Sequence, residues 1–320
     1  MNLEDDPKDH RGRYAERPSQ IPWPGWKAIL KRTFGTVSDA DLSLRCAGVA
    51  FFSFLSIFPV LACFILVYGL VATRDTVRDQ LFTLERFAPK AVFELVQERL
   101  EALLSQPEVG LGVGLLISFG LALWSGSRGT NSLIGTINLA YYQKDGRGFV
   151  TGALLSLGLT LGALGFLTMS LFTVAAIPAL TENLPFARYL ETIILWARWP
   201  ALALMVYLAI LVLYRLAPYR EDAKWRWITP GALTAAVLWM LLSVLFSVYV
   251  EQFGNYSATF GSLSVAVVTM LWLYYSSMVI ALGAALNAEI ELQTKMDTTT
   301  GPQSPMGERG AYVADNLPEQ

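Results

Sequence analysis

The chain has 320 residues, of which 54% are hydrophobic and only 16% are charged, whereas soluble domains carry about 25% charged residues. This composition excludes an ordinary soluble domain and predicts an all-α, polytopic membrane protein. The net charge of −2 gives no basis for binding nucleic acid. The only histidine is His10, in a polar arm, which excludes a histidine-based catalytic or metal site in the folded part.

The first 43 residues form a polar N-terminal arm. Residues 1–19 are rich in charge and are expected to be disordered. Residues 22–34 combine tryptophans, aliphatic residues and lysines, which indicates either a short amphipathic helix at the membrane surface or a simple linker. The apolar run that follows is too long for a signal peptide and lacks a cleavage site, so it is expected to remain as the first span.

Six apolar stretches between residues 44 and 291 are predicted to cross the membrane, because about 20 apolar residues of helix span the hydrocarbon core. The first stretch has no charged residue from Cys46 to Val71, and the last has none from Gly261 to Ala288. Pro59 interrupts the first stretch and predicts a kink. The expected spans are residues 44–71, 109–127, 149–177, 193–215, 229–250 and 261–288.

The distribution of Lys and Arg predicts the orientation. Most basic residues fall in the N-terminal arm, the second and fourth connections and the tail, whereas the fifth connection has none. Because basic loops stay in the cytoplasm, both termini are expected inside, in a plasma or inner membrane. The tail, residues 292–320, is expected to be disordered.

The first outer connection, residues 73–108, is unusually long and has a helical pattern of apolar residues. Its two segments are separated by Pro89, which predicts an amphipathic helical hairpin. Such a hairpin either caps the helix bundle or lies among the lipid headgroups.

Polar residues near the predicted inner ends of the spans are the candidates for a functional site. Ionisable and amide groups are costly at membrane depth and usually face a partner or a wet cavity. We therefore predict a polar inner mouth, with Arg128 and Glu289 at similar depth; the alternative is that Arg128 only anchors the headgroups. The predicted mouth consists of Arg45, Arg128, Asn131, Asn138, Asn287 and Glu289.

Several motifs resemble the YihY/BrkB (virulence factor BrkB) family of bacterial inner-membrane proteins, over residues 44–291. The matching segments are residues 47–53 with 58–59, 123–129, 139–141, 230–232, 256–262 and 282–289, with Phe260 where many members have tyrosine. The resemblance implies six spans with cytoplasmic termini. It also implies association with the envelope and with transport of lipid-like molecules, while an older family label is ribonuclease.

These observations leave two principal functional hypotheses. The first is a transporter or flippase of a lipid-like or small amphiphilic molecule or solute, with membrane lipids as partners. The second is a scaffold without transport, which binds itself or another membrane protein through small-residue helix faces such as Gly158 and Gly162. A membrane-embedded hydrolase is the third and is not favoured, since no nucleotide-binding loop, cofactor motif or metal-spaced cysteine cluster is present.

Overall fold

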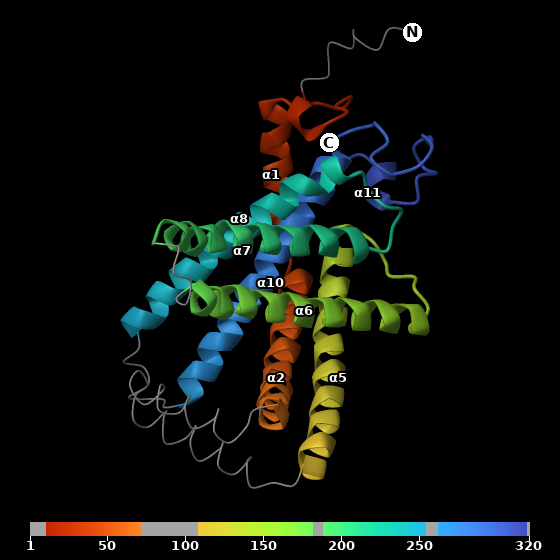
Figure 1. Cartoon of the computed structure of the whole chain (residues 1–320). Coiled ribbons are helices and arrows are strands. Elements are labelled where there is room, and N and C mark those ends of the chain that lie inside the picture. Colours follow the sequence, from red (N-terminus) through yellow and green to blue (C-terminus); the bar gives the residue numbers. More distant parts are fainter. Residues whose placement is uncertain (1–10, 72–107, 182–187, 254–261, 319–320) are drawn as a thin grey trace, which may run out of the picture. The chain divides into compact units, whose positions relative to one another are not determined.

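The computed structural model describes residues 11–71, 108–181, 188–253 and 262–318 (Figure 1). These residues are helical apart from turns and one isolated bridge between Ala223 and Thr299. The first helical turn is a 3-10 helix, η1, at Pro18–Gln20. The helices are α1 (Trp23–Val37), α2 (Ala40–Val71), α5 (Glu108–Ala140), α6 (Phe149–Thr181), α7 (Arg188–Leu216), α8 (Trp225–Phe253), α10 (Ser262–Leu292) and α11 (Tyr312–Asp315).

Five of the described helices are long and apolar enough to cross a membrane. These segments are Ala40–Cys63, Phe149–Ser170, Trp196–Leu216, Trp225–Val250 and Val265–Leu292. The all-helical membrane class is therefore confirmed. The sixth span, at residues 109–127 of α5, stays a prediction, and the hairpin predicted at 73–108 lies almost wholly outside the described residues.

Two compact units make up the chain, Met1–Phe51 with Ser127–Gln320, and Phe52–Gly126. The second unit contains the later part of α2 and the first part of α5, which pack where Leu66 approaches Gly114. Helix α2 continues through Pro59, and the predicted kink there remains a prediction.

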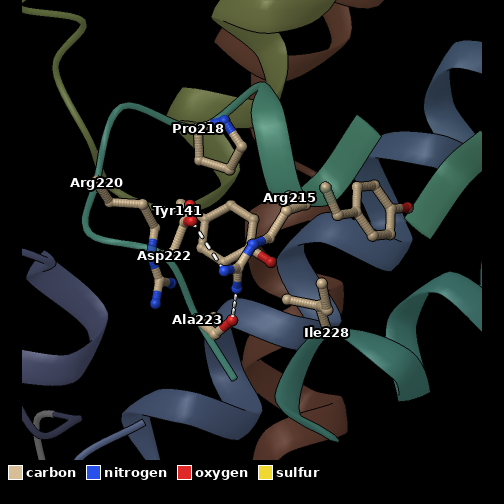
Figure 2. Close-up of a pocket in the computed structure, with 8 residues that line it drawn as sticks. Tyr141, Arg215, Pro218, Arg220, Asp222, Ala223 and Ile228 are labelled. Atoms are coloured by element: carbon tan, nitrogen blue, oxygen red, sulfur yellow. Dashed lines mark hydrogen bonds and ion pairs between the residues drawn. The ribbon is translucent and has the colours of Figure 1, made fainter. Parts of the chain in front are cut away.

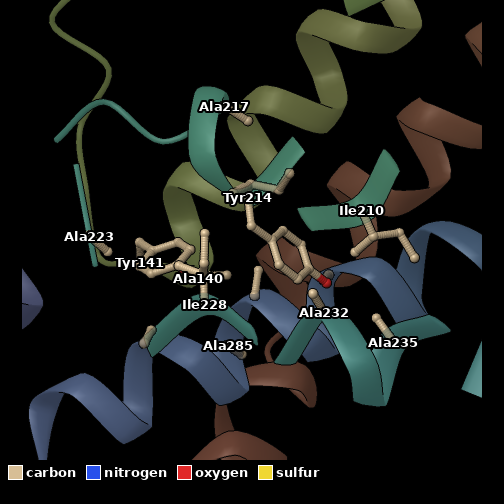
Figure 3. Close-up of a cluster of buried hydrophobic side chains, with 14 of the residues drawn as sticks. Ala140, Tyr141, Ile210, Tyr214, Ala217, Ala223, Ile228, Ala232, Ala235 and Ala285 are labelled. Atoms are coloured by element: carbon tan, nitrogen blue, oxygen red, sulfur yellow. The ribbon is translucent and has the colours of Figure 1, made fainter. Parts of the chain in front are cut away.

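The first unit has its core where α7, α8 and α10 pack together, with contributions from α2 and α5 (Figure 3). Small residues allow the helices to approach closely, and Ala232 and Ala235 of α8 and Ala281 and Ala285 of α10 are all fully buried in this core. The phenol of Tyr214 fills the remaining space and donates a hydrogen bond to the carbonyl of Ile280 at 2.6 Å.

Helix α1 follows two local signals in the sequence. Pro22 and Pro24 stand at its start, where the absent N–H of proline costs nothing. Its buried side carries Gly25, Ile29 and Thr33 at four-residue intervals. The opposite side exposes Trp23, Leu30 and Phe34, flanked by the exposed Lys27 and Lys31. Of the two alternatives for this segment, the structure shows the helix rather than the linker, and its contact with a membrane stays a prediction.

Two sequence predictions are wrong. The C-terminal tail is folded rather than disordered, since Thr298, Val313 and Ala314 are buried and Arg309 donates to the carbonyls of four residues. Residues 11–19 of the N-terminal arm are folded too. Both segments fold although they are polar, because their backbones and charged side chains form hydrogen bonds with each other and with the end of α10. Composition alone does not reveal these bonds.

Helix α5 is longer than the second predicted span. Helix α5 continues for 13 residues beyond residue 127, to Ala140. The extension is stabilised by Ile134, Ile137 and Ala140, which are buried in the core. Hydropathy did not indicate it, because these apolar residues alternate with Thr and Asn residues.

Candidate functional site: a buried ion-pair cluster at the end of α10

The site begins where α8 and α10 cross at two glycines. A Cβ on Gly231 would lie 2.1 Å from the carbonyl oxygen of Gly283, so only glycine permits this approach. Pro230 removes one helical hydrogen bond just before the crossing. Asn287 of α10 bridges the break, because its Oδ1 accepts from the Gly231 N–H at 2.7 Å and its Nδ2 donates to the Ile228 carbonyl at 2.9 Å.

Half a turn beyond Asn287, Glu289 binds two segments that are distant in sequence. Its Oε2 accepts a hydrogen bond from Nε of Arg32, on α1, at 2.5 Å. Its Oε1 accepts from the hydroxyl of Tyr142, just after α5, at 2.6 Å. The Glu289 side chain is only 1% exposed, whereas that of Arg32 is 26% exposed. The carboxylate is therefore held by one cation and one phenol.

Tyr142 holds an unusual position at the end of α5. Its φ of +56° places it in the left-handed region, the one described non-glycine residue found there, a conformation that costs about 1–2 kcal/mol. The hydroxyl also lies 2.9 Å from the Thr36 hydroxyl, and the ring packs on Tyr312. Partial burial, followed by the hydrogen bond to Glu289, raises the pKa of Tyr142 to about 12, although the residue as a whole is 42% exposed. The strained turn thus joins α1, α5, α10 and the tail.

Glu291 forms the second ion pair of the cluster, with Arg220 in the connection between α7 and α8. Nη1 and Nη2 of Arg220 donate to the two carboxylate oxygens at 2.9 and 2.7 Å. Thr298 of the tail donates to Oε2 at 2.7 Å. Burial favours a lower pKa for Arg220, but the adjacent Glu291 charge outweighs it and raises that pKa. The guanidinium also lies 5.2 Å from the ring centroid of Tyr141.

The two terminal segments close around this cluster. The side-chain amide of Gln293 donates to the Arg11 carbonyl at 2.9 Å, and Thr294 donates to the Ala15 carbonyl at 2.7 Å. The tail pairs with the α7–α8 connection through Lys224 N–H to the Thr298 carbonyl at 2.8 Å. The polar groups at the end of α10 are therefore bonded from several sides.

One small cavity lies beside the cluster (Figure 2). It is lined by Tyr141, Tyr214, Arg215, Pro218, Arg220, Asp222, Ala223 and Ile228. Arg215 crosses it to pair with Asp222 at 2.8 Å and to bond the Ala223 carbonyl. The cavity volume is about 10 Å³, which is about the room one water molecule needs. It cannot hold a substrate in this conformation.

The structure divides the predicted inner mouth into two groups. Asn287 and Glu289 belong to the cluster, and buried Asn138 lies near it, where its Oδ1 accepts from the Tyr219 N–H at 2.7 Å. The other three, Arg45, Asn131 and Arg128, are exposed on α2 and α5.

The predicted common depth of Arg128 and Glu289 is wrong. Glu289 contacts Tyr142, which lies 14 residues after Arg128 in the sequence. Because α5 is continuous to Ala140, this separation of 14 residues places Arg128 about 20 Å from Tyr142 along the helix. The error arose because α5 was expected to end at residue 127.

Sequence reasoning missed several residues of the cluster: Arg32, Tyr142, Arg220, Glu291 and Thr298. The available signal was Glu-Ile-Glu directly after an uncharged span, because two carboxylates there need cations. The sequence offered many basic residues on that side and no means of choosing between them. Among the described residues, no group of three His, Cys, Asp or Glu side chains could hold a metal ion.

These features define the class: an all-α, multi-pass membrane protein whose last span ends in a saturated cluster of buried ion pairs. The chain belongs to the virulence factor BrkB family, whose model matches residues 33–307. It is 32% identical over 276 residues to the ribonuclease-like protein YfkH of Bacillus subtilis (strain 168), covering 84% of this chain and 97% of that protein.

Two further relatives are membrane proteins of the UPF0761 group. PSHAa0171 of Pseudoalteromonas translucida (strain TAC 125) is 23% identical over 86% of this chain and 89% of its own length. A protein of Xanthomonas oryzae pv. oryzae (strain PXO99A) is 27% identical over 82% of this chain and 62% of its own length. No solved structure matches the chain.

Proposed function

We propose that this protein moves a lipid-like amphiphile between the leaflets of a bacterial inner membrane, with both termini in the cytoplasm. The described conformation is the one closed at the cytoplasmic side. The observation that carries the proposal is the cluster at the end of α10, where Glu289 and Glu291 are 1% and 0% exposed. Buried carboxylates at the end of a span are costly, and membrane proteins retain them mainly for function.

The arrangement of the cluster supports closure. Glu289 and Glu291 are neutralised by Arg32 from α1 and Arg220 from the α7–α8 connection, so separating either segment from α10 breaks an ion pair. The cavity beside them has room for about one water. Movement of α1 away from α10 is the simplest opening, because Arg32 is the more exposed of the two arginines.

An enzymatic role is not proposed. The name of the YfkH relative calls that protein ribonuclease-like, but the single histidine of this chain is His10, outside the described residues. The cluster carboxylates are bonded to Arg, Tyr and Thr and have no open position for a substrate.

Reconstitution tests the proposal. The purified protein is placed in liposomes that contain acyl-labelled fluorescent phosphatidylglycerol, and a membrane-impermeant reductant quenches the outer leaflet. Protein-dependent movement of label from the inner leaflet is expected. If liposomes with folded protein match protein-free liposomes for this lipid and for a panel of other amphiphiles, the transport proposal is wrong.

A scaffold is the second candidate, favoured by the uncovered glycines of α6. At Gly158, Gly162 and Gly165, a Cβ would meet no described atom of another element within 4 Å. Such faces allow close helix packing against another chain. Cross-linking of Gly162→Cys variants in native membranes distinguishes the two roles: a specific partner together with no lipid movement would establish the scaffold.

A further inference from the structure

The three predicted mouth residues that lie outside the cluster form a second feature. Helices α2 and α5 are antiparallel here, since Gly48 lies beside Ser132 and Arg45 lies beside Gly135. The Ser132 hydroxyl donates to the Arg45 carbonyl at 3.3 Å. A Cβ on Gly135 would come within 2.9 Å of the Arg45 guanidinium, so the absence of a side chain at Gly135 leaves room for this guanidinium against α5.

Arg128 and Asn131 lie on the same face of α5 as Ser132 and Gly135, because residues three, four and seven apart share a helix face. Arg45, Arg128 and Asn131 are all exposed. Arg128 precedes Gly135 by seven residues, about 10 Å along the helix. Along this face, the Arg45 guanidinium beside Gly135 is therefore followed by the Asn131 amide and then by the Arg128 guanidinium, in the direction away from the end of α5 at Ala140.

The charged side chains that α2 and α5 themselves contribute to this track are both arginines. Arg45 is the only charged residue between residues 42 and 71, and Arg128 is the only one between residues 109 and 140. Among the described residues, Arg45 forms no ion pair. A guanidinium binds a phosphate through two parallel hydrogen bonds, whereas a neutral or cationic headgroup offers no equivalent.

We propose that Arg45, Asn131 and Arg128 form a track that binds the phosphate of an anionic phospholipid. Arg45 takes the headgroup at the membrane surface, and Arg128 takes it about 10 Å deeper. This inference rests on the proposed function, for which it names the substrate class. A role as a headgroup anchor explains Arg45, which lies beside Gly135 near the end of α5. It does not explain Arg128, which lies on the same face and farther from that end.

The test compares two lipids in the same reconstituted protein. Fluorescent phosphatidylglycerol and phosphatidylcholine are assayed separately for movement between leaflets. The expected result is faster movement of phosphatidylglycerol, reduced about tenfold by Arg128→Gln, because a hydrogen bond to a charged group is lost. Arg128→Lys is expected to give a rate between those of the unmodified protein and Arg128→Gln, because lysine keeps the charge but not the two parallel hydrogen bonds. Arg226→Gln, an exposed arginine of α8, is the control and changes neither lipid.

Gly135→Ala provides a second variant that leaves both arginines in the chain. The added methyl displaces the Arg45 guanidinium, so it is expected to slow phosphatidylglycerol without slowing phosphatidylcholine. Equal rates for the two lipids in the unmodified protein, unaffected by Arg128→Gln, would overturn the track while leaving the transport proposal intact.

Binding separates the two proposals if no lipid moves. The protein in nanodiscs of equal phosphatidylglycerol and phosphatidylcholine is purified, and its retained lipids are quantified. Enrichment of phosphatidylglycerol that Arg45→Gln/Arg128→Gln abolishes would establish the track without transport. No enrichment would overturn it. Displacement by millimolar glycerol phosphate would overturn the lipid assignment, because it would show a site for the soluble anion.

Discussion

Arg32 of α1 and Glu289 of α10, 257 residues apart, are joined by an ion pair with 2.5 Å between Nε and Oε2. The pair fastens an exposed helix that precedes the first span to the end of the last one. Arg32 also donates to the side chain of Gln293 at 2.9 Å. One arginine thus bonds two successive turns of α10, and its removal has consequences for stability and for opening.

Arg32→Gln is expected to lower stability by about 2 kcal/mol, because it leaves Glu289 buried without a cation. The loss is smaller than the roughly 3–5 kcal/mol of a fully buried pair, since Arg32 is partly exposed. Arg32→Gln/Glu289→Gln is expected to recover most of it. Thermal denaturation in detergent measures the effect, with Arg226→Gln as the control. A double variant no more stable than Arg32→Gln would contradict the pairing.

The close crossing of α8 and α10 at Gly231 predicts that alanine lowers the stability of the protein there but not at a glycine of α6. Gly231→Ala is expected to destabilise the protein by at least about 1–3 kcal/mol, the usual range for an overpacked core, because the new methyl meets the Gly283 carbonyl. Gly162→Ala on α6 meets no described neighbour and is the matched control. The denaturation midpoints of both variants are compared. Equal midpoints would show that α8 and α10 do not cross at this glycine.

The fold of the tail predicts resistance to proteases. Arg309 donates to the carbonyls of Lys295, Met296, Ser304 and Ala314, and so closes the tail on itself. Arg309→Ala is expected to make residues 296–318 accessible to limited proteolysis in intact detergent micelles, whereas the unmodified tail is cut slowly. Rapid cutting of the unmodified tail would restore the prediction of disorder.

The membrane class of this protein could be predicted from the sequence, but the pairing of charged residues in the cluster could not. Uncharged runs of more than 20 residues identified the membrane class, because the bilayer imposes length and polarity on each helix separately. The cluster depends on pairs such as Arg220 with Glu291, which connect segments 71 residues apart. No local pattern specifies which cation meets which carboxylate. The motif residues Gly231, Gly283 and Asn287 were noticed, but their meeting at one crossing required the structure.

Tyr142 predicts a loss of stability in alkaline solution. Its pKa is raised from the ordinary value of 10 to about 12 in the folded protein, so its contribution is full below pH 10 and is lost as the pH rises from 10 to 12. Tyr142→Phe removes the titrating hydroxyl and is expected to flatten this part of the stability profile. Denaturation midpoints from pH 9 to pH 12 provide the comparison, and identical slopes for both proteins would contradict the hydrogen bond to Glu289.

The exposed side of α1 predicts contact with lipid. Trp23 and Phe34 are 72% and 74% exposed on the side opposite Ile29, an arrangement typical of a helix at the membrane surface. Brominated lipids are expected to quench a fluorophore at Phe34→Cys and to leave one at the exposed loop residue Lys144→Cys nearly unchanged, in a background without Cys46 and Cys63. Equal quenching at both positions would contradict the prediction.

The most direct test of closure by the Arg32–Glu289 pair is the rate of lipid movement in Arg32→Gln/Glu289→Gln. This variant removes the ion pair and leaves no unpaired buried charge, so the protein remains folded. In liposomes with fluorescent phosphatidylglycerol, movement is expected to be faster than with the unmodified protein, because the closed state loses a stabilising contact. A rate equal to or below that of the unmodified protein, at equal folded protein, would contradict closure by this pair.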